Sequence, residues 1–447
     1  MAKDKKKENL TPEERLQAAL VPDWEQPYKV PENWRWVTLD STTSIIMGQS
    51  PSGANTTDDS QYTPLIGGAA DMGDLYPKVT RYTKVPTKLS TNQDLILCIR
   101  ATLGKPVYSD KEYCLGRGVA AIRPHIGNRS FYKYFFNAFE QYLYDNATGT
   151  TFAQVSSQIL QQMPLPLPPL PEQQRIVDRI ESLFAKLDEV KQKTQDALDS
   201  FETRKAAILH KAFTGELTAQ WRKEHGVGME QWKQICFDNS FIKMQNGLAK
   251  RSGSSGVPYS VLRLANLSDA GISTEDMRTI LLDTKEQENY GLKKNDVLMI
   301  RVNGSKENVG KQFLLTTDNQ WAFCDHIIRI KYKENLLPAY MVYFSKSDTY
   351  KLYVENHMVS SAGQNTISRK GMASLSIPVP DLREQTEIVH ILDDLLAKEQ
   401  QAKDAAETVL EQIDLIKKSI LARAFRGELD TNDPAEESAV ELVKEVI

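Results

Sequence analysis

The stretch LPLPPLPEQQRIV, residues 165–177, returns 212 residues later as IPVPDLREQTEIV, residues 377–389. The same shift relates KAAILHKAFTGEL (205–217) to KKSILARAFRGEL (417–429). Upstream, DLILCIRATLGK (94–105) resembles DVLMIRVNGSKENVGK (296–311) once a short insertion is allowed. A repeat of this length predicts a chain built from two similar halves, each with a globular segment followed by a helix.

An apolar seam follows each proline-rich stretch. Steps of four and three residues from Ile176 and from Ile388 meet mostly apolar side chains, which is the heptad pattern of a coiled coil. At 1.5 Å per residue, a seam of about 40 residues predicts a helix roughly 60 Å long. Prolines prevent helix upstream of each start, and Gly215 and Gly427 stand where each helix should end. The seam residues are Ile176, Ile180, Leu183, Leu187, Phe201, Ile208, Ile388, Leu392, Leu395, Ile413, Ile416 and Ile420.

Two matching seams can bury each other as an antiparallel coiled coil, which would give the chain pseudo-twofold symmetry. The alternative is that each helix covers only its own globular domain. The sequence divides into an N-terminal arm (1–32), a first domain (33–166), a first spacer helix (167–217), a second domain (218–378), a second spacer helix (379–430) and an acidic tail (431–447).

The globular segments combine strands and short helices. LILCIR, VLMIR, GVAAIRP and HIIRIKY read as strands, and turn residues separate them. An aromatic helix is expected before each spacer helix, over residues 131–144 and 339–354. The predicted fold class is therefore α+β, with two similar mixed α/β domains separated by two long helices.

Composition indicates a globular chain of two or more domains. Its 447 residues are 40% hydrophobic and 26% charged, with a net charge of −4. Residues 34–160 and 232–370 are mildly basic, with net charges of +2 and +5, and the connecting parts are acidic. No signal peptide or membrane span is recognisable, so a cytoplasmic location is expected. The four cysteines form no CxxC pair, which argues against a zinc site or a disulfide framework.

No catalytic motif stands out. The phosphate loop GxxxxGK[ST], the dinucleotide motif GxGxxG, the zinc motif HExxH and the nucleophile elbow GxSxG are absent from the sequence. The six histidines show no metal-ligand spacing. We therefore expect no catalytic residue, metal or cofactor, and a protein that is not an enzyme.

Polar loops suggest nucleic-acid binding. The loops RATLGK and RVNGSKENVGK follow apolar strands, and TGTTFAQVS (148–156) matches SAGQNTIS (361–368). Their amide, hydroxyl and basic side chains can bond phosphates and base edges, and Gly lets the backbone approach closely. Ordinary polar turns are the alternative for any one residue. The candidate DNA-binding residues are Arg100, Lys105, Arg117, Thr150, Thr151, Arg301, Asn303, Lys306, Lys311, Gln364, Asn365 and Ser368.

These motifs together resemble the DNA-specificity subunit of type I restriction–modification systems. The likeness rests on the W-x-W-V pattern at Trp34, on LILCIRATLGK, on TGTTFAQVS followed by PLPLPPLPEQQRIV, and on ILHKAFTGEL repeated as ILARAFRGEL. It extends over nearly the whole chain, including ALVPDWEQPYKVPENWRWV and the tail DPAEESAVELVKEV.

The resemblance implies two target-recognition domains, each reading one half of a split site in double-stranded DNA. It also implies that the spacer helices set the gap and dock two methyltransferase subunits, which use S-adenosylmethionine, and that motor–endonuclease subunits join the complex. There are two alternative functions. A DNA methyltransferase in its own right would carry an NPPF- or DPPY-type motif, which this sequence lacks. A coiled-coil scaffold with two protein-binding domains would show no DNA binding.

Overall fold

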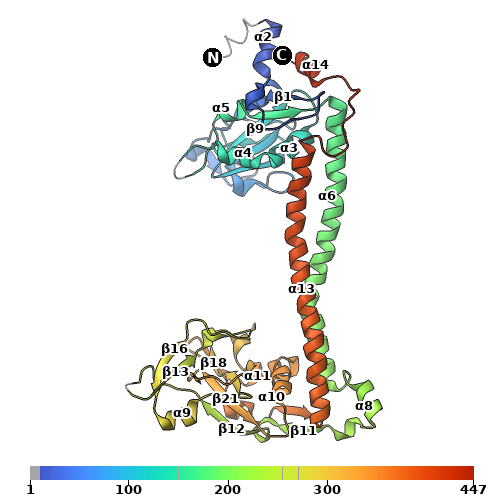
Figure 1. Cartoon of the computed structure of the whole chain (residues 1–447). Coiled ribbons are helices and arrows are strands. Elements are labelled where there is room, and N and C mark those ends of the chain that lie inside the picture. Colours follow the sequence, from blue (N-terminus) through green and yellow to red (C-terminus); the bar gives the residue numbers. More distant parts are fainter. Residues whose placement is uncertain (1–10, 150–151, 254, 270, 447) are drawn as a thin grey trace. The chain divides into compact units, whose positions relative to one another are not determined.

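The computed structural model describes residues 11–149, 152–253, 255–269 and 271–446. The chain forms two compact units (Figure 1). The first contains residues 1–194 and 408–447, and the second contains residues 195–407. Each unit thus takes part of both long helices.

The first unit is built on an antiparallel sheet of four strands in the order β2-β9-β6-β7. Its central strand β6 (Leu95–Arg100) is buried along the LILCI run. The aromatic helix expected over 131–144 is two helices, α3 (Arg129–Ala138) and α4 (Glu140–Asp145). The other elements of this unit are α2 (Pro12–Ala19), β1 (Arg35–Thr38), β2 (Thr43–Met47), β3 (Thr56–Thr57), β4 (Thr63–Ile66), β5 (Tyr82–Thr83), β7 (Thr102–Tyr108), β8 (Cys114–Leu115), β9 (Val119–Pro124), α5 (Ser157–Gln161), β10 (Pro164–Leu167) and α14 (Ala439–Lys444).

The second unit repeats this plan. Its four-stranded sheet has the order β12-β21-β17-β19, and β17 (Val297–Ile300) takes the place of β6. Here too the expected aromatic helix is two helices, α10 (Pro338–Phe344) and α11 (Asp348–His357). The other elements are α8 (Ala219–His225), β11 (Lys233–Cys236), β12 (Phe241–Asn246), β13 (Val257–Leu262), β14 (Leu267–Ser268), β15 (Gly271–Ile272), β16 (Arg278–Leu282), α9 (Thr284–Tyr290), β18 (Val302–Asn303), β19 (Gln312–Leu314), β20 (Trp321–Phe323), β21 (Ile327–Tyr332), β22 (Val359–Ser361), β23 (Gln364–Thr366), α12 (Arg369–Met372) and β24 (Ser376–Val379). The predicted α+β class with a repeated mixed domain is confirmed.

The repeated proline stretch is a buried strand. β10 pairs antiparallel with β1, and β24 pairs antiparallel with β11 in the same way. Proline tolerates such two-stranded pairing because a strand with only one neighbour needs few of its N–H groups. Each strand leads directly into a long helix, α6 (Leu170–Asp199) or α13 (Leu382–Ala424).

The first spacer helix is interrupted, whereas one continuous helix was expected. α6 ends at Asp199, and α7 (Phe201–Thr214) begins after Ser200, whose backbone stays in the helical region. The Ser200 hydroxyl donates to the carbonyl oxygen of Ala197 at 2.7 Å. Such a back-bond competes with the regular helical ladder and bends helices. Gly215 ends α7 with a φ of 84°, as expected, and Gly427 has a φ of 75° three residues after α13 ends.

The two long helices run antiparallel within each unit. In the first unit Lys417 pairs with Asp188, and Lys191 lies 3.9 Å from Asp414. In the second unit Arg204 lies 3.0 Å from Glu399. Residue numbers therefore rise along one helix as they fall along the other, as the coiled-coil prediction requires.

Burial along the seam is greatest next to the domains. Ile176 and Ile180 belong to the core of the first unit, and Ile388 and Leu392 to that of the second, so the helices also cover their own domains. Phe201 and Ile413 are buried too, whereas Leu183, Leu187, Ile208, Leu395 and Ile420 are half-buried.

Ile416 is the exception, and its prediction as a buried seam residue is wrong, because it is 44% exposed. The seam instead passes from Ile413 to Lys417, whose amine lies 5.0 Å from the centre of the Phe184 ring. A lysine stem can cover apolar surface while its amine stays in water. The seam therefore steps four residues from Ile413, whereas the prediction assumed a step of three.

A buried carboxylate joins each helix start to its domain. Glu172 accepts hydrogen bonds from the Trp34 indole at 2.7 Å, the Asn432 amide at 2.9 Å and the Thr431 hydroxyl at 3.2 Å. Glu384, its match in the repeat, accepts from Trp232 at 2.8 Å, Thr218 at 2.6 Å and Arg222 at 2.6 Å. We call each set of contacts a carboxylate clasp. Burial raises the pKa of Glu172, and the three hydrogen bonds oppose that effect.

The glutamine that follows Glu172 or Glu384 also makes a buried hydrogen bond. The Gln173 amide donates to the Pro168 carbonyl at 3.1 Å, and the Gln385 amide donates to the Pro380 carbonyl at 2.9 Å. The repeated Glu-Gln pair of the opening stretch is therefore a buried polar joint between strand and helix.

The acidic tail packs into the first unit. Arg175 makes two hydrogen bonds of 2.8 Å to Glu436, and the Ala439 amide donates to the Asn33 carbonyl at 2.9 Å. Ala439 and Val443 of α14 are buried in the same core as Trp34. Residues from both ends of the chain thus complete one domain.

Candidate nucleic-acid interface

In the first unit the two predicted loops meet. The Ala101 amide donates to the Ala153 carbonyl at 2.8 Å, and the Val155 amide donates to the Ile99 carbonyl at 2.9 Å. Arg100 therefore pairs with Gln154 at the end of β6. Two reciprocal backbone bonds between Thr148 and Gln154 close the second loop. Thr150 and Thr151 lie outside the residues that the structure describes.

The second unit brings its two loops together in the same way. β18 pairs with β23, which pairs with β22, and the Ile367 amide donates to the Arg301 carbonyl at 3.0 Å. Gln364 is exposed on this hairpin. The sequence match between residues 148–156 and 361–368 thus corresponds to matched positions in the fold.

Arg100 and Arg301 do not occupy equivalent positions, although each is the last residue of its predicted strand, LILCIR or VLMIR. Ile99 donates its amide to the Gly118 carbonyl, and Arg301 donates its amide to the His326 carbonyl at the same point of the sheet. Arg301 is therefore the counterpart of Ile99, and Val302 is the counterpart of Arg100. The shared Ile-Arg dipeptide suggested a register that is wrong by one residue, and one residue reverses the face of a strand.

This register places Arg301 on the inner face. Its Nε atom is buried and has no hydrogen-bond partner among the described residues. Lys105 and Lys311 do correspond, because each follows a glycine with positive φ, 80° at Gly104 and 84° at Gly310. Lys105, Arg117 and Lys306 are exposed, whereas the Lys311 amine binds Asp269 at 2.7 Å.

Three other predicted residues hold their loops. The Asn303 side chain accepts from the Ser305 amide at 2.9 Å. Asn365 is buried and donates to the Gly304 carbonyl at 2.8 Å. The Ser368 hydroxyl caps α12 by accepting from the Gly371 amide at 3.1 Å. These contacts favour a role in shaping the surface over direct contact with a ligand.

The sequence analysis missed the turn that matches Arg117. Gly116 donates to the Ile66 carbonyl and Cys324 donates to the Leu262 carbonyl, so Asp325 takes the place of Arg117. His326 Nδ1 lies 3.1 Å from the Asp325 carboxylate. One ligand atom each from Cys324, Asp325 and His326 lies within 4.8 Å of the others, a grouping that could hold a metal ion. Burial raises the pKa of the Cys324 thiol, which disfavours the thiolate that a metal needs.

Phe152 was also overlooked. Its side chain is 58% exposed, next to the residues that pair with β6. By the shift of 212 residues it matches Gln364. An exposed aromatic ring is a feature of surfaces that stack on bases, and only the fold shows that this ring is uncovered.

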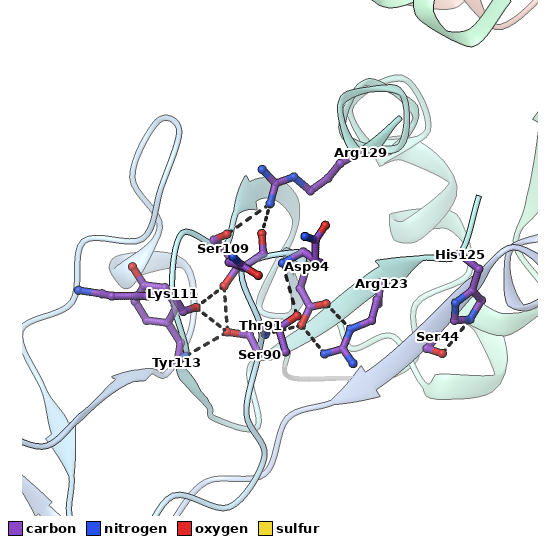
Figure 2. Close-up of polar contacts among 12 residues, drawn as sticks. Ser44, Ser90, Thr91, Asp94, Ser109, Lys111, Tyr113, Arg123, His125 and Arg129 are labelled. Atoms are coloured by element: carbon purple, nitrogen blue, oxygen red, sulfur yellow. Dashed lines mark hydrogen bonds and ion pairs between the residues drawn. The ribbon is translucent and has the colours of Figure 1, made fainter. Parts of the chain in front are cut away.

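A polar network fixes the opposite end of the sheet, where β6 begins (Figure 2). Arg123 on β9 makes two hydrogen bonds to Asp94, of 2.7 Å and 3.0 Å, and the Thr91 amide donates to the same carboxylate at 2.7 Å. The hydrogen bond with Asp94 raises the pKa of Arg123. Arg129 reaches from α3 to the Ser109 carbonyl, as Figure 2 shows.

The second unit repeats the buried carboxylate. Asp296 accepts from the Lys293 amide at 3.0 Å and lies 3.6 Å from Arg329 on β21. Because both carboxylates are held by an arginine of the neighbouring strand and by a turn amide, they serve the scaffold. Neither is positioned as an acid–base catalyst.

Comparison with known proteins identifies the family. The model for the type I restriction modification DNA specificity domain matches residues 31–199 and 259–411. The chain therefore belongs to that family, as the sequence motifs led us to expect.

The relatives include the StySPI specificity subunit of Salmonella potsdam, with 29% identity over 91% of this chain and 92% of the relative. The EcoKI specificity subunit of Escherichia coli K12 is 26% identical over the same shares. Among solved structures, the HsdS subunit of Thermoanaerobacter tengcongensis is 20% identical and covers 90% of this chain and 99% of its own, with a TM-score of 0.60. A chain from a structure on the assembly of a type I R-M system is 20% identical, covers 90% and 100%, and has a TM-score of 0.66. These two likenesses show a shared fold.

Proposed function

We propose that this chain supplies the DNA sequence specificity of a type I restriction–modification complex. One target-recognition domain (33–166) reads one half of a bipartite site in double-stranded DNA, and the other (218–378) reads the second half. The observation that carries the proposal is the repeated loop pair beside β6 and β17, which presents different side chains at matched positions. The relatives are named as specificity subunits of type I restriction enzymes, which supports the same role.

In this proposal the chain has no catalytic role. Methyltransferase subunits methylate the DNA, and motor–endonuclease subunits cleave it. The buried carboxylates described above all bind structural partners, which supports a scaffold and reading role.

In the described part of the chain, no helix combines the length and apolarity needed to cross a membrane.

The exposed apolar residues of the long helices support partner docking. In the first unit Leu415 is 64% exposed, and Ile416 and Val190 are also exposed. Apolar side chains left open on a paired helix are typical of a surface that another protein covers. We propose that a methyltransferase subunit binds there, so that Leu415→Glu should release it in a pull-down, whereas Lys418→Glu, at another exposed position of the same helix, should not.

Exchange of one domain tests the reading role. Residues 33–166 would be replaced by the corresponding region of the StySPI relative, and methylated adenines would be mapped in cells that carry the chimera. One half of the methylated motif should change while the other half and the gap stay the same. A motif in which both halves change together would contradict independent reading. A gel-shift assay with the partner subunits separates this role from that of a protein-binding scaffold.

A further inference from the structure

The second unit contains a large cavity, and two of its lining residues, Lys306 and Lys311, are also candidate DNA-binding residues. Its volume is about 1070 Å³, and its walls come from α7, the loop after β14, the residues around β19 and the helices α10 and α11. Its walls are partly apolar, with Phe313, Trp321 and Val354 among them. Five lysines and four carboxylates also line it.

Three of these lysines gather around one carboxylate. Asp269 binds the Lys311 amine at 2.7 Å, and this hydrogen bond, followed by the charges of Lys311, Lys205 and Lys346, lowers the pKa of Asp269 against the opposing effect of burial. The three lysines come from separate elements: Lys205 from α7, Lys311 from the start of β19, and Lys346 from the turn after α10. We call Lys205, Lys311 and Lys346 the lysine triad.

The triad holds more positive charge than its carboxylate balances. Neither Lys205 nor Lys346 has a salt bridge within 4.0 Å among the described residues, and Asp269 is 83% exposed in its side chain. Crowding by the surrounding protein lowers the pKa of Lys346, and the neighbouring charge of Lys205 lowers it further. The charges of Asp269 and Asp393 oppose these effects, and the Lys346 amine also lies 5.0 Å from the centre of the Tyr343 ring. A doubly charged anion would further offset the repulsion between the ammonium groups of Lys205 and Lys346.

The first unit differs from the second at the position that matches Lys205. Lys417 is the counterpart of Lys205 in the repeat, yet its amine pairs with Asp188 and lies over the Phe184 ring. The triad is therefore not a general consequence of the fold, and the repeat supplies a matched control.

We propose that the lysine triad binds a phosphate group in this cavity, in the position where Asp269 now acts as an internal counter-ion. Lysine ammonium groups bind phosphate as point charges, which suits a site built from flexible side chains of three elements. The phosphate could belong to a DNA strand, in which case the inference rests on the proposed function, or to a free nucleotide. The apolar wall that includes Trp321 gives room for a base in the second case.

The test uses the full chain and two probes, sodium tripolyphosphate and a duplex that lacks the methylated motif. Lys205→Gln and Lys346→Gln should each weaken binding, whereas Lys417→Gln should leave it unchanged. For the duplex, each triad substitution should lower the slope of log affinity against log salt by about one, the value for one lost phosphate contact. Asp269→Asn should strengthen binding, because the competing carboxylate loses its charge.

The outcomes separate the possibilities. Saturable binding of tripolyphosphate that depends on the triad identifies a free phosphate ligand and stands even if the chain binds no DNA. An effect on the duplex alone identifies the DNA backbone. If the triad variants behave like Lys417→Gln with both probes, or if Asp269→Asn weakens binding, the proposal is wrong. Duplex binding that no triad substitution alters would leave the proposed DNA role in place without this site.

Discussion

The indole N–H of Trp34 donates a 2.7 Å hydrogen bond to the buried carboxylate of Glu172, and 212 residues further on Glu384 accepts the same bond from Trp232. A helix start is thus tied to its domain by one charged hydrogen-bond acceptor in each unit. This contact explains why the glutamate of the Glu-Gln pair occurs at the start of both long helices.

The clasps should contribute measurably to stability. Trp34→Phe removes the indole donor while keeping an aromatic ring, and a lost hydrogen bond to a buried charged group costs about 1.5–3 kcal/mol. We expect a decrease of that size in the free energy of unfolding, measured with urea. Trp232→Phe should have a smaller effect, because Arg222 still neutralises Glu384. Equal stability of wild type and Trp34→Phe would show that the bond contributes nothing.

Acidification should favour the folded first unit through Glu172. Burial raises the folded-state pKa of Glu172 above its ordinary value of 4.5. The native state therefore takes up its proton at a higher pH than the unfolded chain does, so stability from this group falls as pH rises from 4.5 to the raised pKa. Glu172→Gln should remove this dependence. Unfolding curves of both proteins across that range should diverge, with wild type losing more stability than the variant as pH rises.

Arg100 and Arg301 should respond differently to substitution. Arg100→Ala should weaken DNA binding by about 1–3 kcal/mol if the contact is bidentate to a base. For Arg301 a DNA contact is also proposed. Its buried Nε donor, unpaired among the described residues, costs about 1–3 kcal/mol in the folded protein. Arg301→Leu removes this donor and should therefore also raise the free energy of unfolding. Measuring DNA affinity and urea stability for both variants distinguishes the two effects. Matching behaviour in both assays would contradict the corrected register.

Phe152 should matter for DNA and not for folding. Its ring is mostly exposed, so Phe152→Ala should leave the melting temperature unchanged. If the ring stacks on a base, its removal should cost roughly 1–3 kcal/mol of DNA affinity, and Phe152→Trp should retain most of the binding. Loss of affinity in the Trp variant equal to that in the Ala variant would exclude stacking.

The spacer should tolerate whole heptads inserted in both helices. Seven residues added after Gln195 and seven after Ala405 would keep the seam in phase and lengthen each helix by about 10 Å. At about 3.4 Å per base pair, the gap between the half-sites should grow by about three base pairs. Mapping methylated adenines in cells that carry the variant measures this gap. Insertion in only one helix should abolish recognition, and an unchanged gap in the double variant would exclude the helices as the measure of distance.

Patterns that depend on periodicity were predictable from the sequence. The seams, the central strands and the repeat all follow from side-chain spacing, and the structure confirms them. The register at Arg301 was not predictable, because a shared Ile-Arg dipeptide outweighed the ungapped match of residues 94–99 to residues 296–301 that backbone pairing reveals. The prediction for Ile416 was wrong because the stem of Lys417 occupies the seam instead. The clasps and the lysine triad stayed hidden because their members are joined only by folding: Thr431, for example, meets Glu172 across 259 residues.

The packing of the tail into the first unit has a consequence for synthesis on the ribosome. The N-terminal domain buries Phe425 against Phe131 and Phe135, so its core cannot close until the end of α13 has been translated. At about 5–20 residues per second, the 259 residues between Glu172 and Thr431 take roughly 10–50 s. The second unit is a single continuous segment and can complete its fold during that interval. In this chain the domain that emerges first is therefore the one that finishes last, and the aromatic residues of its core stay without Phe425 during that interval.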